Sequence, residues 1–545
     1  MTAAVGRDGG ATYDYVVVGA GSAGCVLAAR LSEDPAARVL VLEAGGPDRA
    51  LFIRGPGLYY MLWRGKHDWA FRTEPQAGVR GRRMFWPRGR VVGGSSSLNA
   101  MIYIRGHRSN YDGWRDDGNP GWGYDDVLPY FKRSENWCGA PSEYHGSGGP
   151  LDVRPGSECA PAADAFIAAA CERCGVGRND DFNGAEQEGA GTYQFTVRNG
   201  RRWSAADAFL HPSRERANLD VQTGAHVLGL VVAGGRVEGV RYAVGREERV
   251  ARASGEVILA AGAVGSPHVL LLSGIGPAEH LRSVGVDVVH DLPGVGENLQ
   301  DHLFAVAQYR ALARGARAYT RLGSLAWLGR YALRGRGPLA LPPVHSGAFV
   351  RSRPGLARPD LQFHVLPWGG FTPNFDENIG PDPGAHLTIL PTLIYPDSRG
   401  VIRLRSADSR EAPAIDPRYL SAPADLDLLV TGLELAREIA AAPPLARYRG
   451  EEVAPGPSVT DGDGLREDIR LRTNTIFHPV GTCRMGSDER AVVDAELKVR
   501  GLAGLRVVDG SIMPTIVGGN THAPIVMIAE KASDLVRGRP APAPA

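Results

Sequence analysis

The fold is decided by the segment Tyr15-Val-Val-Val-Gly-Ala-Gly-Ser-Ala-Gly24. Three valines before the glycines predict a buried strand, and residues 25–31 (Cys-Val-Leu-Ala-Ala-Arg-Leu) predict a helix. A strand, a glycine-rich turn and a helix in this order are typical of a dinucleotide site. Gly19 permits the tight turn, Gly21 lets the backbone approach a pyrophosphate, and Gly24 lets the helix pack close to the strand.

The same segment is expected to hold phosphates through its backbone. Ser22 and Ala23 begin the predicted helix, where exposed amides and the positive end of the helix dipole favour an anion. A second predicted strand, Val39-Leu-Val-Leu-Glu43, ends in a carboxylate 24 residues after Gly19. That spacing places Glu43, followed by Ala44, where a ribose hydroxyl would be bound. The pattern does not by itself separate FAD from NAD.

Composition is that of an ordinary globular enzyme. The chain has 545 residues, 43% of them hydrophobic, and its 61 basic and 60 acidic residues nearly cancel. No global field exists to attract nucleic acid, so we expect no nucleic-acid partner. The first ten residues lack the apolar core of a secretory signal, and no apolar stretch approaches membrane-spanning length. These features predict a cytoplasmic protein.

Six cysteines are too sparse for a disulfide framework in a chain of this length. Cys171 and Cys174 form a CxxC pair on a predicted helix that includes residues 164–171. No second pair stands at zinc-ligand spacing, so we interpret the two thiols as packing groups. No His/Asp/Glu/Cys group has the sequence spacing of metal ligands either, and no metal site is predicted.

Composition changes along the chain and predicts a discontinuous nucleotide domain. Strand-like stretches at 361–366 and 387–393 suggest an inserted, largely β domain, whereas 504–509 and 523–535 return to the strand-and-helix pattern of the start. We therefore predict an α/β protein: a discontinuous Rossmann-like domain plus an α+β substrate-binding domain with an antiparallel sheet. The predicted parts are 12–155, 201–306 and 475–538 for the nucleotide domain, 156–200 for a connecting or substrate-domain segment, 307–474 for the substrate domain, and 539–545 for a disordered tail.

Four separated segments together resemble the glucose-methanol-choline family of FAD-dependent alcohol oxidases and dehydrogenases. The first is the glycine turn, and the second is Gly89-Arg-Val-Val-Gly-Gly-Ser-Ser-Ser-Leu-Asn-Ala-Met101, continuing to residue 106. The third spans residues 262–276. The fourth comprises Phe477-His-Pro-Val-Gly-Thr-Cys-Arg-Met-Gly486, Asp509-Gly-Ser-Ile-Met-Pro514 and Asn520-Thr-His-Ala-Pro524. In this order the segments span nearly the whole chain.

The resemblance implies that FAD is the cofactor and that the second segment lies against the flavin ring. Ser95 to Ser97 would offer amides and hydroxyls to flavin oxygens. Some family members attach FAD through a histidine just before the asparagine of this segment; Leu98 occupies that position here, so we predict non-covalent FAD. Besides the residues of the turn, the expected cofactor contacts are Glu43, Ala44, Arg90, Val92, Gly94, Ser97, Asn99, Ala100, Met101, Val227, Ala261, Asp509, Gly510, Thr521 and Pro524.

The fourth segment implies the catalytic pair. Matching motif to motif places His478 at the position of the base and Asn520 at that of its partner, with His522 as the competing candidate. Oxidation of an alcohol moves a hydride to the flavin more easily once the hydroxyl proton has left, which calls for a base with a pKa near neutrality. An amide hydrogen bond from Asn520 would favour the developing alkoxide.

The substrate is predicted from one difference between this sequence and the choline-oxidising members of the family. Choline-oxidising relatives place a glutamate ahead of Gly-x-Phe, and His345 stands at the similar position here. With Trp368, Phe371 and Phe477 it suggests an apolar, aryl-accommodating pocket and a neutral primary alcohol, because a cation needs a carboxylate or an aromatic cage. The electron acceptor, dioxygen or a quinone or protein, stays open, as does the oligomeric state.

Two alternatives of other kinds remain. A flavin lyase or photodecarboxylase could use the same fold, because fold alone does not fix a reaction. Residues 317–336 mix arginines with Tyr319, Trp327 and leucines, as an interfacial helix of a membrane-surface electron-transfer protein would. We favour a helix packed over the inserted domain with solvated arginines, since three glycines weaken it.

Overall fold

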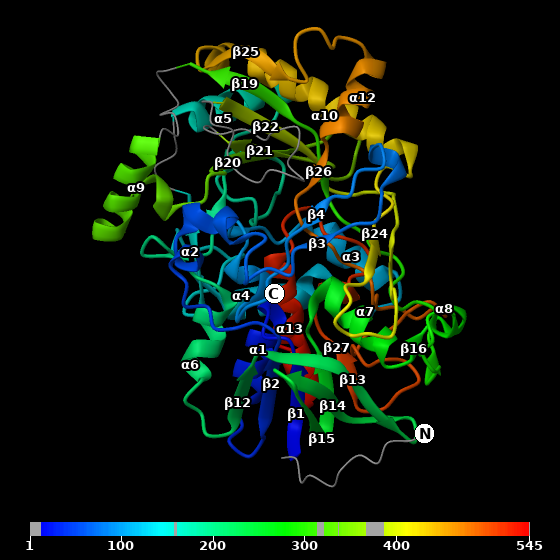
Figure 1. The fold of residues 1–545 in the computed structure, drawn as a ribbon. Helices are drawn as coiled ribbons and strands as arrows, with labels where there is room; N and C mark the ends of the chain where they lie inside the picture. The colour runs from blue at the N-terminus through cyan, green and yellow to red at the C-terminus, as the bar shows by residue number, and fades with distance from the viewer. Residues whose placement is uncertain (1–11, 157–160, 313–320, 336, 367–385, 544–545) are drawn as a thin grey trace.

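The computed structural model describes residues 12–156, 161–312, 321–335, 337–366 and 386–543. Two large sheets lie at opposite ends of the molecule, the one built around the N-terminal strand at the bottom of Figure 1 and the other at the top. This arrangement confirms the predicted combination of a discontinuous Rossmann-like domain and a second domain with an antiparallel sheet.

The first sheet has seven strands and holds the nucleotide turn. Its centre is parallel, because β1 pairs in parallel with β2 and with β15, while β13 and β14 form an antiparallel extension. β1 runs from Thr12 to Val18, and its last three residues are fully or almost fully buried, as expected of a parallel strand covered on both faces. In spatial order the strands are β12 (Leu219–Thr223), β2 (Val39–Glu43), β1, β15 (Glu247–Leu259), β14 (Arg236–Val244) and β13 (Ala225–Ala233), with β27 (Leu505–Val507) beside β15.

Helices from both ends of the chain cover this sheet. The first helix, α1 (Ser22–Leu31), packs against the last, α13 (His522–Arg537), and α4 (Tyr124–Ser134) packs on α13 in turn. α7 (Gly262–Leu272) follows β15 and contacts β13. One hydrophobic cluster joins these helices to the strands, so residues about 500 positions apart share a core. This long-range contact brings the start of α13 to the glycine turn, as Figure 1 shows at the centre of the molecule.

The second sheet is antiparallel and has a separate core. Helices α5 (Pro161–Cys174) and α10 (Pro423–Ala441) pack on it. α12 (Gly462–Arg472) packs on α10, and α11 (Pro443–Ala446) on α5. In spatial order the strands are β25 (Arg449–Ala454), β19 (Ala307–Ala311), β22 (His386–Leu393), β21 (Leu361–Leu366), β20 (Ser346–Val350) and β8 (Gly189–Thr192), with β18 (Leu303–Phe304) beside β22 and β26 (Asn474–Thr475) beside β18.

Several predicted elements are confirmed at or near their predicted bounds. β2 and β21 have the bounds expected from the sequence, and α5 contains the predicted helix at 164–171. After the nucleotide domain the chain returns to the second sheet at β18, four residues before the predicted start of the substrate domain. α5 and β8 come from the predicted connecting segment and belong to the second domain, because they pack on or pair with β20.

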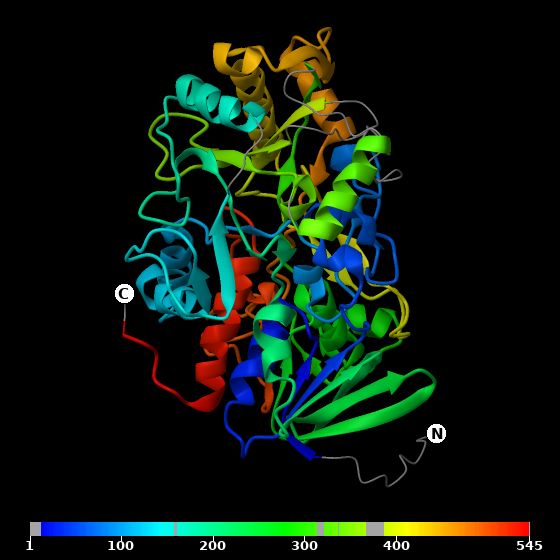
Figure 2. The same cartoon turned by 90° about the vertical axis from the view of Figure 1, so that its left-hand side faces the viewer.

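A group of neighbouring helices lies on the side of the molecule that faces the viewer in Figure 2. It contains α2 (Leu51–Arg54), the 3-10 helix η1 (Pro56–Leu62) and α9 (Arg321–Arg334). α9 confirms a helix within residues 317–336, of which 317–320 and 336 lie outside the described residues. Among the helices that the structure describes, none is both long enough and apolar enough to cross a bilayer.

Candidate active site

Close backbone approach shapes the glycine turn. A Cβ on Gly24 would stand 1.8 Å from the carbonyl oxygen of Gly19, and one on Gly94 would stand 2.6 Å from the Cα of Gly21. Glycine at 24 therefore lets α1 pack on the turn, as predicted, and glycine at 94 lets the second segment touch the first. Gly93 N donates to the Ala20 carbonyl over 2.8 Å, which joins the two segments. The helix N-terminus is thus held between them with its amides available to an anion.

Glu43 lies at the end of β2 beside this turn. Its carboxylate accepts hydrogen bonds from the backbone N–H groups of Ala20 (2.9 Å) and Gly45 (2.7 Å). Burial nevertheless raises the pKa of Glu43 to about 7, against the lowering effect of those two amides. The carboxyl group therefore braces the turn, and Ala44 follows it half-buried.

The serine-rich second segment forms the 3-10 helix η3 (Gly94–Ser97), and its hydroxyls are engaged in the segment itself. Ser96 Oγ donates to the Gly93 carbonyl (2.6 Å), and Ser97 Oγ donates to that of Val92 (2.8 Å). This differs from the expectation that these hydroxyls face flavin oxygens. The local bonds satisfy buried groups and stiffen the loop.

Asn99 is held by a residue that the sequence did not single out. Arg202 is buried, and its Nη1 donates to Asn99 Oδ1 (2.7 Å) and to the Ser96 carbonyl (3.0 Å). Asn99 Oδ1 also accepts from the Met101 backbone N–H (3.1 Å). Ala100 and Met101 follow at the wall of a cavity that Asn99 also lines. Burial lowers the pKa of Arg202 to about 9.

Asp509 connects the third segment to the fourth. Its carboxylate accepts hydrogen bonds from Gly262 N (2.8 Å) at the start of α7, from Ser266 Oγ (2.5 Å), and from Ser511 N (2.8 Å). It is buried, and burial raises its pKa. Asp509, two residues after β27, therefore fixes the N-terminus of α7 beside Ala261.

The remaining predicted cofactor residues come from several elements around the turn. Val227 is on β13, and Gly510 begins the 3-10 helix η6 (Gly510–Ile512). Thr521 precedes α13, and Pro524 lies in its first turn. Val92 is buried next to Val91, which bridges to Gly46, and the Arg90 guanidinium lies 4.8 Å from the centre of the Trp69 ring.

The predicted catalytic pair is in direct contact. Asn520 Nδ2 lies 3.2 Å from His478 Nε2. Gln362 Nε2, on β21, lies 3.5 Å from Asn520 Oδ1, which orients the amide with its NH₂ group toward the imidazole. The two residues come from loops 42 positions apart, and a strand of the second domain sets their mutual orientation.

A second histidine sets the tautomer of the first. His302 Nε2 lies 3.0 Å from the Ile394 carbonyl oxygen, so this nitrogen carries a proton. Burial lowers the pKa of His302 to about 3, and the neutral ring therefore presents Nδ1 as an acceptor. His478 Nδ1 lies 3.0 Å from that atom and must donate. His478 Nε2 is consequently the unprotonated nitrogen, which accepts from Asn520.

Asp301 anchors the backbone of the same loop. Its Oδ1 accepts from the His478 backbone N–H (2.7 Å), and its Oδ2 accepts from the hydroxyls of Tyr419 and Thr475. The preceding residue, Phe477, has a φ of +69°, a conformation that is strained for a bulky side chain. Its carbonyl accepts from the buried guanidinium of Arg88. Together these hydrogen bonds hold the strained loop, and with it the His478 imidazole, in place.

The pKa of His478 differs from the near-neutral value that we expected. Desolvation lowers it well below 6.5, and the neighbouring His302, His364 and Arg88 lower it further. The physical reason is that an imidazolium would lose its hydration without gaining a carboxylate partner. The neutral ring is therefore favoured over the imidazolium.

His522, the competing candidate, has a different environment. It is the first residue of α13, and its Nδ1 lies 3.1 Å from Ser22 Oγ in the glycine turn. Burial lowers its pKa to about 4. Its hydrogen bond connects it to the nucleotide turn, whereas Asn520 contacts His478, so the geometry supports Asn520 as the partner.

His478 and Asn520 open onto a cavity of about 190 Å³ between the two domains. Its wall contains no Asp or Glu among the described residues, and Arg88 is its charged member. Trp63 packs edge-on against Phe477, with ring centroids 5.4 Å apart, and against Tyr59, at 5.5 Å. The other apolar lining residues include Phe304, Val344, Leu366, Leu390 and Ile476.

The predicted substrate residues have three different outcomes. Phe477 lines the cavity. His345 is buried but does not line it, because its neighbour Val344 takes the wall position at the start of β20. Trp368 and Phe371 lie outside the described residues.

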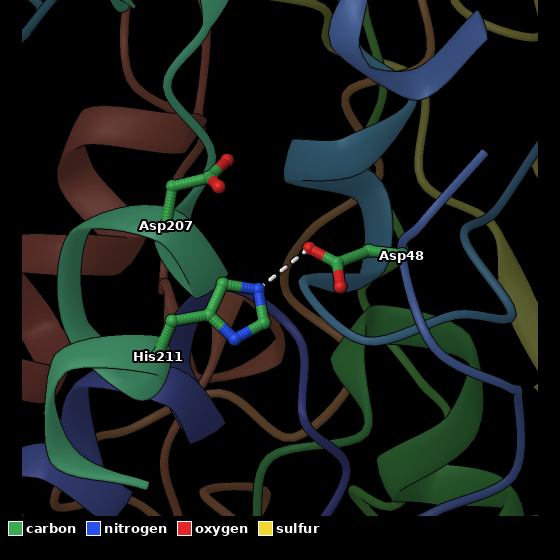
Figure 3. Close-up of side chains that lie close together, drawn as sticks. All are labelled: Asp48, Asp207 and His211. Carbon is green, nitrogen blue, oxygen red and sulfur yellow. Dashed lines mark hydrogen bonds and ion pairs between the residues drawn. The ribbon is translucent and has the colours of Figure 1, made fainter. Parts of the chain in front are cut away.

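One group of side chains in the described part of the chain has the chemistry of metal ligands, although the sequence analysis did not single it out. Asp48, Asp207 and His211 bring ligand atoms within 4.8 Å of one another, and Figure 3 shows His211 directed at Asp48. His211 Nε2 lies 2.9 Å from Asp48 Oδ2, which raises the pKa of His211. Arg49, Arg54 and Arg214 line the same pocket and disfavour a cation, so we interpret the group as an ion pair.

The predicted CxxC pair lies far from this chemistry. Cys171 and Cys174 are half-buried against the second hydrophobic core. Burial raises the pKa of both thiols, that of Cys174 to about 11. High thiol pKa values favour packing over reactivity.

Sequence reasoning missed His302, His364, Asp301, Arg88 and Arg202. Asp301 and His302 are adjacent, and the stretch Asn298-Leu-Gln-Asp-His302 has no periodicity or ligand spacing to mark it. Each of these side chains acts through partners more than 80 positions away or through a cavity, which a local pattern cannot indicate.

The residues around the turn fit a dinucleotide with a flat ring. Among the buried side-chain polar atoms that have no hydrogen-bond partner in the described residues are His522 Nε2 and Arg202 Nη2. His522 lines the cavity, and Arg202 holds Asn99 at its wall. Unsatisfied buried polar atoms next to a glycine cradle are groups that a bound cofactor would satisfy. The fold and this site define a flavoprotein oxidoreductase.

The chain belongs to the GMC oxidoreductase family, whose N-terminal family model matches residues 13–304 and whose C-terminal model matches 396–529. It is therefore an FAD-dependent oxidoreductase. It is 45% identical to an alcohol dehydrogenase [acceptor] of Pseudomonas putida over 96% of this chain and 95% of that protein. It is 42% identical to the mitochondrial choline dehydrogenase of Homo sapiens over 99% and 92% of the two chains.

Two solved structures have the same fold over almost their whole length. Pyridoxine 4-oxidase from "Mesorbium loti" has a TM-score of 0.88 at 35% identity, with 97% of this chain and 100% of that one covered. A fungal aryl-alcohol oxidase has a TM-score of 0.82 at 26% identity, with 96% and 98% covered.

Proposed function

We propose that this protein oxidises a neutral primary alcohol to the aldehyde, with His478 as the base and Asn520 as the hydrogen-bond donor to the substrate oxygen. The observation that carries the proposal is the tautomer of His478. Contact with His302 leaves the Nε2 lone pair on the cavity side, 3.2 Å from the Asn520 amide. A hydroxyl group both donates and accepts hydrogen bonds, so it can donate to His478 Nε2 and accept from the Asn520 amide.

In the proposed reaction the alcohol oxygen binds between these two groups. The hydroxyl proton moves to His478 Nε2, while Asn520 Nδ2 donates to the oxygen as negative charge develops on it. FAD, when bound, accepts the hydride that leaves the carbinol carbon. Loss of one proton and one hydride converts the alcohol to the aldehyde. The depressed pKa of His478 keeps the base free of a proton before each turnover.

Water exclusion follows from the apolar wall. Tyr59, Trp63 and Phe477 contribute aromatic surface, and aliphatic side chains line most of the remaining wall. A low-dielectric cavity strengthens the Asn520 hydrogen bond to a developing charge. It also favours a substrate with an apolar body.

The wall supports a neutral rather than a cationic substrate. No carboxylate lines the described cavity, and the buried Arg88 would repel a quaternary ammonium group. Relatives named for aryl alcohols, for pyridoxine and for an unspecified alcohol support a neutral hydroxyl compound. The choline dehydrogenases among the relatives, together with the aromatic group at Trp63, make choline the second candidate.

An anaerobic titration of the flavin spectrum tests the function. We expect benzyl alcohol and a medium-chain primary alcohol to bleach the flavin band, and choline to do so at least tenfold less efficiently. Bleaching by choline ahead of both would overturn the substrate proposal. If no alcohol bleaches the flavin, the alternative is a lyase or photodecarboxylase, which product analysis under illumination would identify.

Readmission of air then tests the acceptor. Recolouring within the time of one turnover indicates an oxidase, whereas slow recolouring that a quinone analogue accelerates indicates a dehydrogenase. We propose the dehydrogenase because the relative of 45% identity is named for an acceptor.

A further inference from the structure

Apolar side chains are exposed together on one side of the molecule. Leu51 and Phe52 on α2, Met61 on η1 and Leu333 on α9 expose 58%, 37%, 52% and 86% of their surface. They make up half of the eight large hydrophobic side chains that are exposed in the described chain. Exposed apolar residues that gather in one region mark an interaction site.

The three elements form one continuous surface. Tyr331 on α9 donates a hydrogen bond through its hydroxyl to the Arg54 carbonyl at the end of α2 (3.2 Å). Leu58 of η1 and Tyr331 share a small core with Leu339 and Ala340, against which Trp327 and Leu328 also pack. Figures 1 and 2 show α2 and α9 next to each other from both directions. The inward face of α9 is thus packed, as expected, and Leu333 lies on its outward face.

Basic residues accompany the exposed apolar ones. Arg54, Arg64 and Lys66 are exposed around α2 and η1, and Arg330 and Arg334 are exposed on α9. The sequence has no Asp or Glu from 49 to 67 or from 302 to 359, although the whole chain has a net charge of only +1. This region of the surface is therefore positively charged, although the protein as a whole is nearly neutral.

Two acidic groups beside this surface are already engaged. Asp48 pairs with His211, and Asp207 accepts from the Ser204 hydroxyl over 2.7 Å. Both lie in the adjoining pocket together with Arg49 and Arg54. We call the surface formed by Leu51, Phe52, Arg54, Met61, Arg330, Leu333 and Arg334 the apolar–basic face.

We propose that the apolar–basic face docks this protein on the surface of a bilayer that contains anionic lipids. Leu51, Phe52, Met61 and Leu333 enter the boundary between headgroups and acyl chains, and the arginines pair with lipid phosphates. Charge complementarity favours an anionic membrane over a second copy of this chain, because two copies would oppose basic faces. Long arginine side chains also keep their charge at headgroup level while their stems cover apolar surface.

The position of η1 connects this surface to the cavity. Met61 points outward on the apolar–basic face, while Tyr59 and Trp63, two positions away on either side, line the cavity. Docking would place one cavity wall at the lipid boundary, where apolar alcohols and quinones concentrate. The docking itself does not rest on the proposed function, and its test needs no turnover.

The experiment is sedimentation of the FAD-loaded protein with vesicles. We expect binding to phosphatidylcholine vesicles that contain phosphatidylglycerol, weak binding to phosphatidylcholine alone, and release as salt approaches ~1 M, where screening is nearly complete. The double variant R330E/R334E should weaken binding more than tenfold, since each basic residue contributes roughly fivefold near an anionic surface. The triple variant L51S/M61S/L333S should weaken binding at low salt, although it leaves the charge of the face unchanged.

Matched variants elsewhere provide the control. Val289→Ser and Leu471→Ser change exposed apolar side chains away from this face and should leave binding unchanged. FAD content and thermal unfolding establish that each variant is folded. The proposal is overturned if wild-type protein does not bind anionic vesicles, or if the face variants bind them as wild type does.

Discussion

At the residue scale the site depends on which nitrogen of His478 carries a proton. A carbonyl oxygen accepts only, so the Ile394 carbonyl determines the tautomer of His302, and His302 determines that of His478. A local motif could suggest the base, but the tautomer is the product of three separate chain segments.

Removal of the base should separate chemistry from cofactor binding. We expect His478→Ala to slow flavin reduction by alcohol about a hundred- to ten-thousandfold, the usual contribution of general-base catalysis, while FAD content stays the same. Stopped-flow absorbance of the flavin band measures this. His290→Gln, at a histidine that does not line the cavity, serves as the control. Near-wild-type reduction in His478→Ala would refute the assignment.

His302 is a positioning residue, and its variants should differ by hydrogen-bonding capacity. In His302→Leu nothing accepts from His478 Nδ1, so both tautomers form and flavin reduction should slow ~10- to 100-fold, as for other residues that orient a functional histidine. His302→Asn offers an amide oxygen and should restore most of the rate. Substrate binding should change little in either variant. Equal losses in the two variants would indicate a packing role only.

At the element scale the second segment illustrates how a loop is stiffened. Its serine hydroxyls satisfy its own carbonyls, and Leu98 packs in a cluster with Ile53, Leu62 and Val91. The predicted strands β2 and β21 agree with the structure because alternation and apolar runs are local signals. The engaged hydroxyls of η3 were not predictable, because they depend on where a tight turn points each side chain.

Attachment of FAD is a property of this segment. Leu98 has no nucleophilic atom and stands where a linking histidine would be needed, so we expect the cofactor to dissociate. Acid precipitation should leave the yellow chromophore in the supernatant, with the mass of unmodified FAD. A yellow pellet, or a polypeptide heavier by one flavin, would contradict this expectation.

At the scale of the whole molecule, burial of histidines couples stability to pH. Burial lowers the pKa of His302 and His364 to about 3 and that of His268, His345 and His522 to about 4, against 6.5 in the unfolded chain. Below pH 6.5 the unfolded state therefore binds more protons at these sites. Each additional proton that the unfolded state binds lowers the free energy of unfolding by about 1.4 kcal/mol for every unit by which the pH is lowered.

Buried carboxyl groups with a raised pKa, including Asp509, act in the opposite direction. Glu43, with a pKa of about 7, and Asp301, with a pKa of about 6, hold protons in the folded state that they would lose on unfolding. The histidines with a lowered pKa outnumber these carboxyl groups. The urea concentration at the unfolding midpoint, measured with excess FAD, should therefore decrease as the pH is lowered from about 7 to about 5. His345→Gln should reduce that slope. A urea midpoint that increases as the pH is lowered from about 7 to about 5 would contradict the prediction.

The sequence by itself determined the nucleotide turn, the position of local elements such as β2 and β21, the family and the identity of His478 and Asn520 as the predicted pair. These depend on short-range signals, such as glycines where two backbones touch and apolar runs of strand length. Only the tertiary structure decided the tautomer of His478, the burial that depresses its pKa, the brace of Arg202 on Asn99 and the apolar–basic face. Each of these arises from side chains brought together across the two domains, and their distance along the chain carries no local pattern.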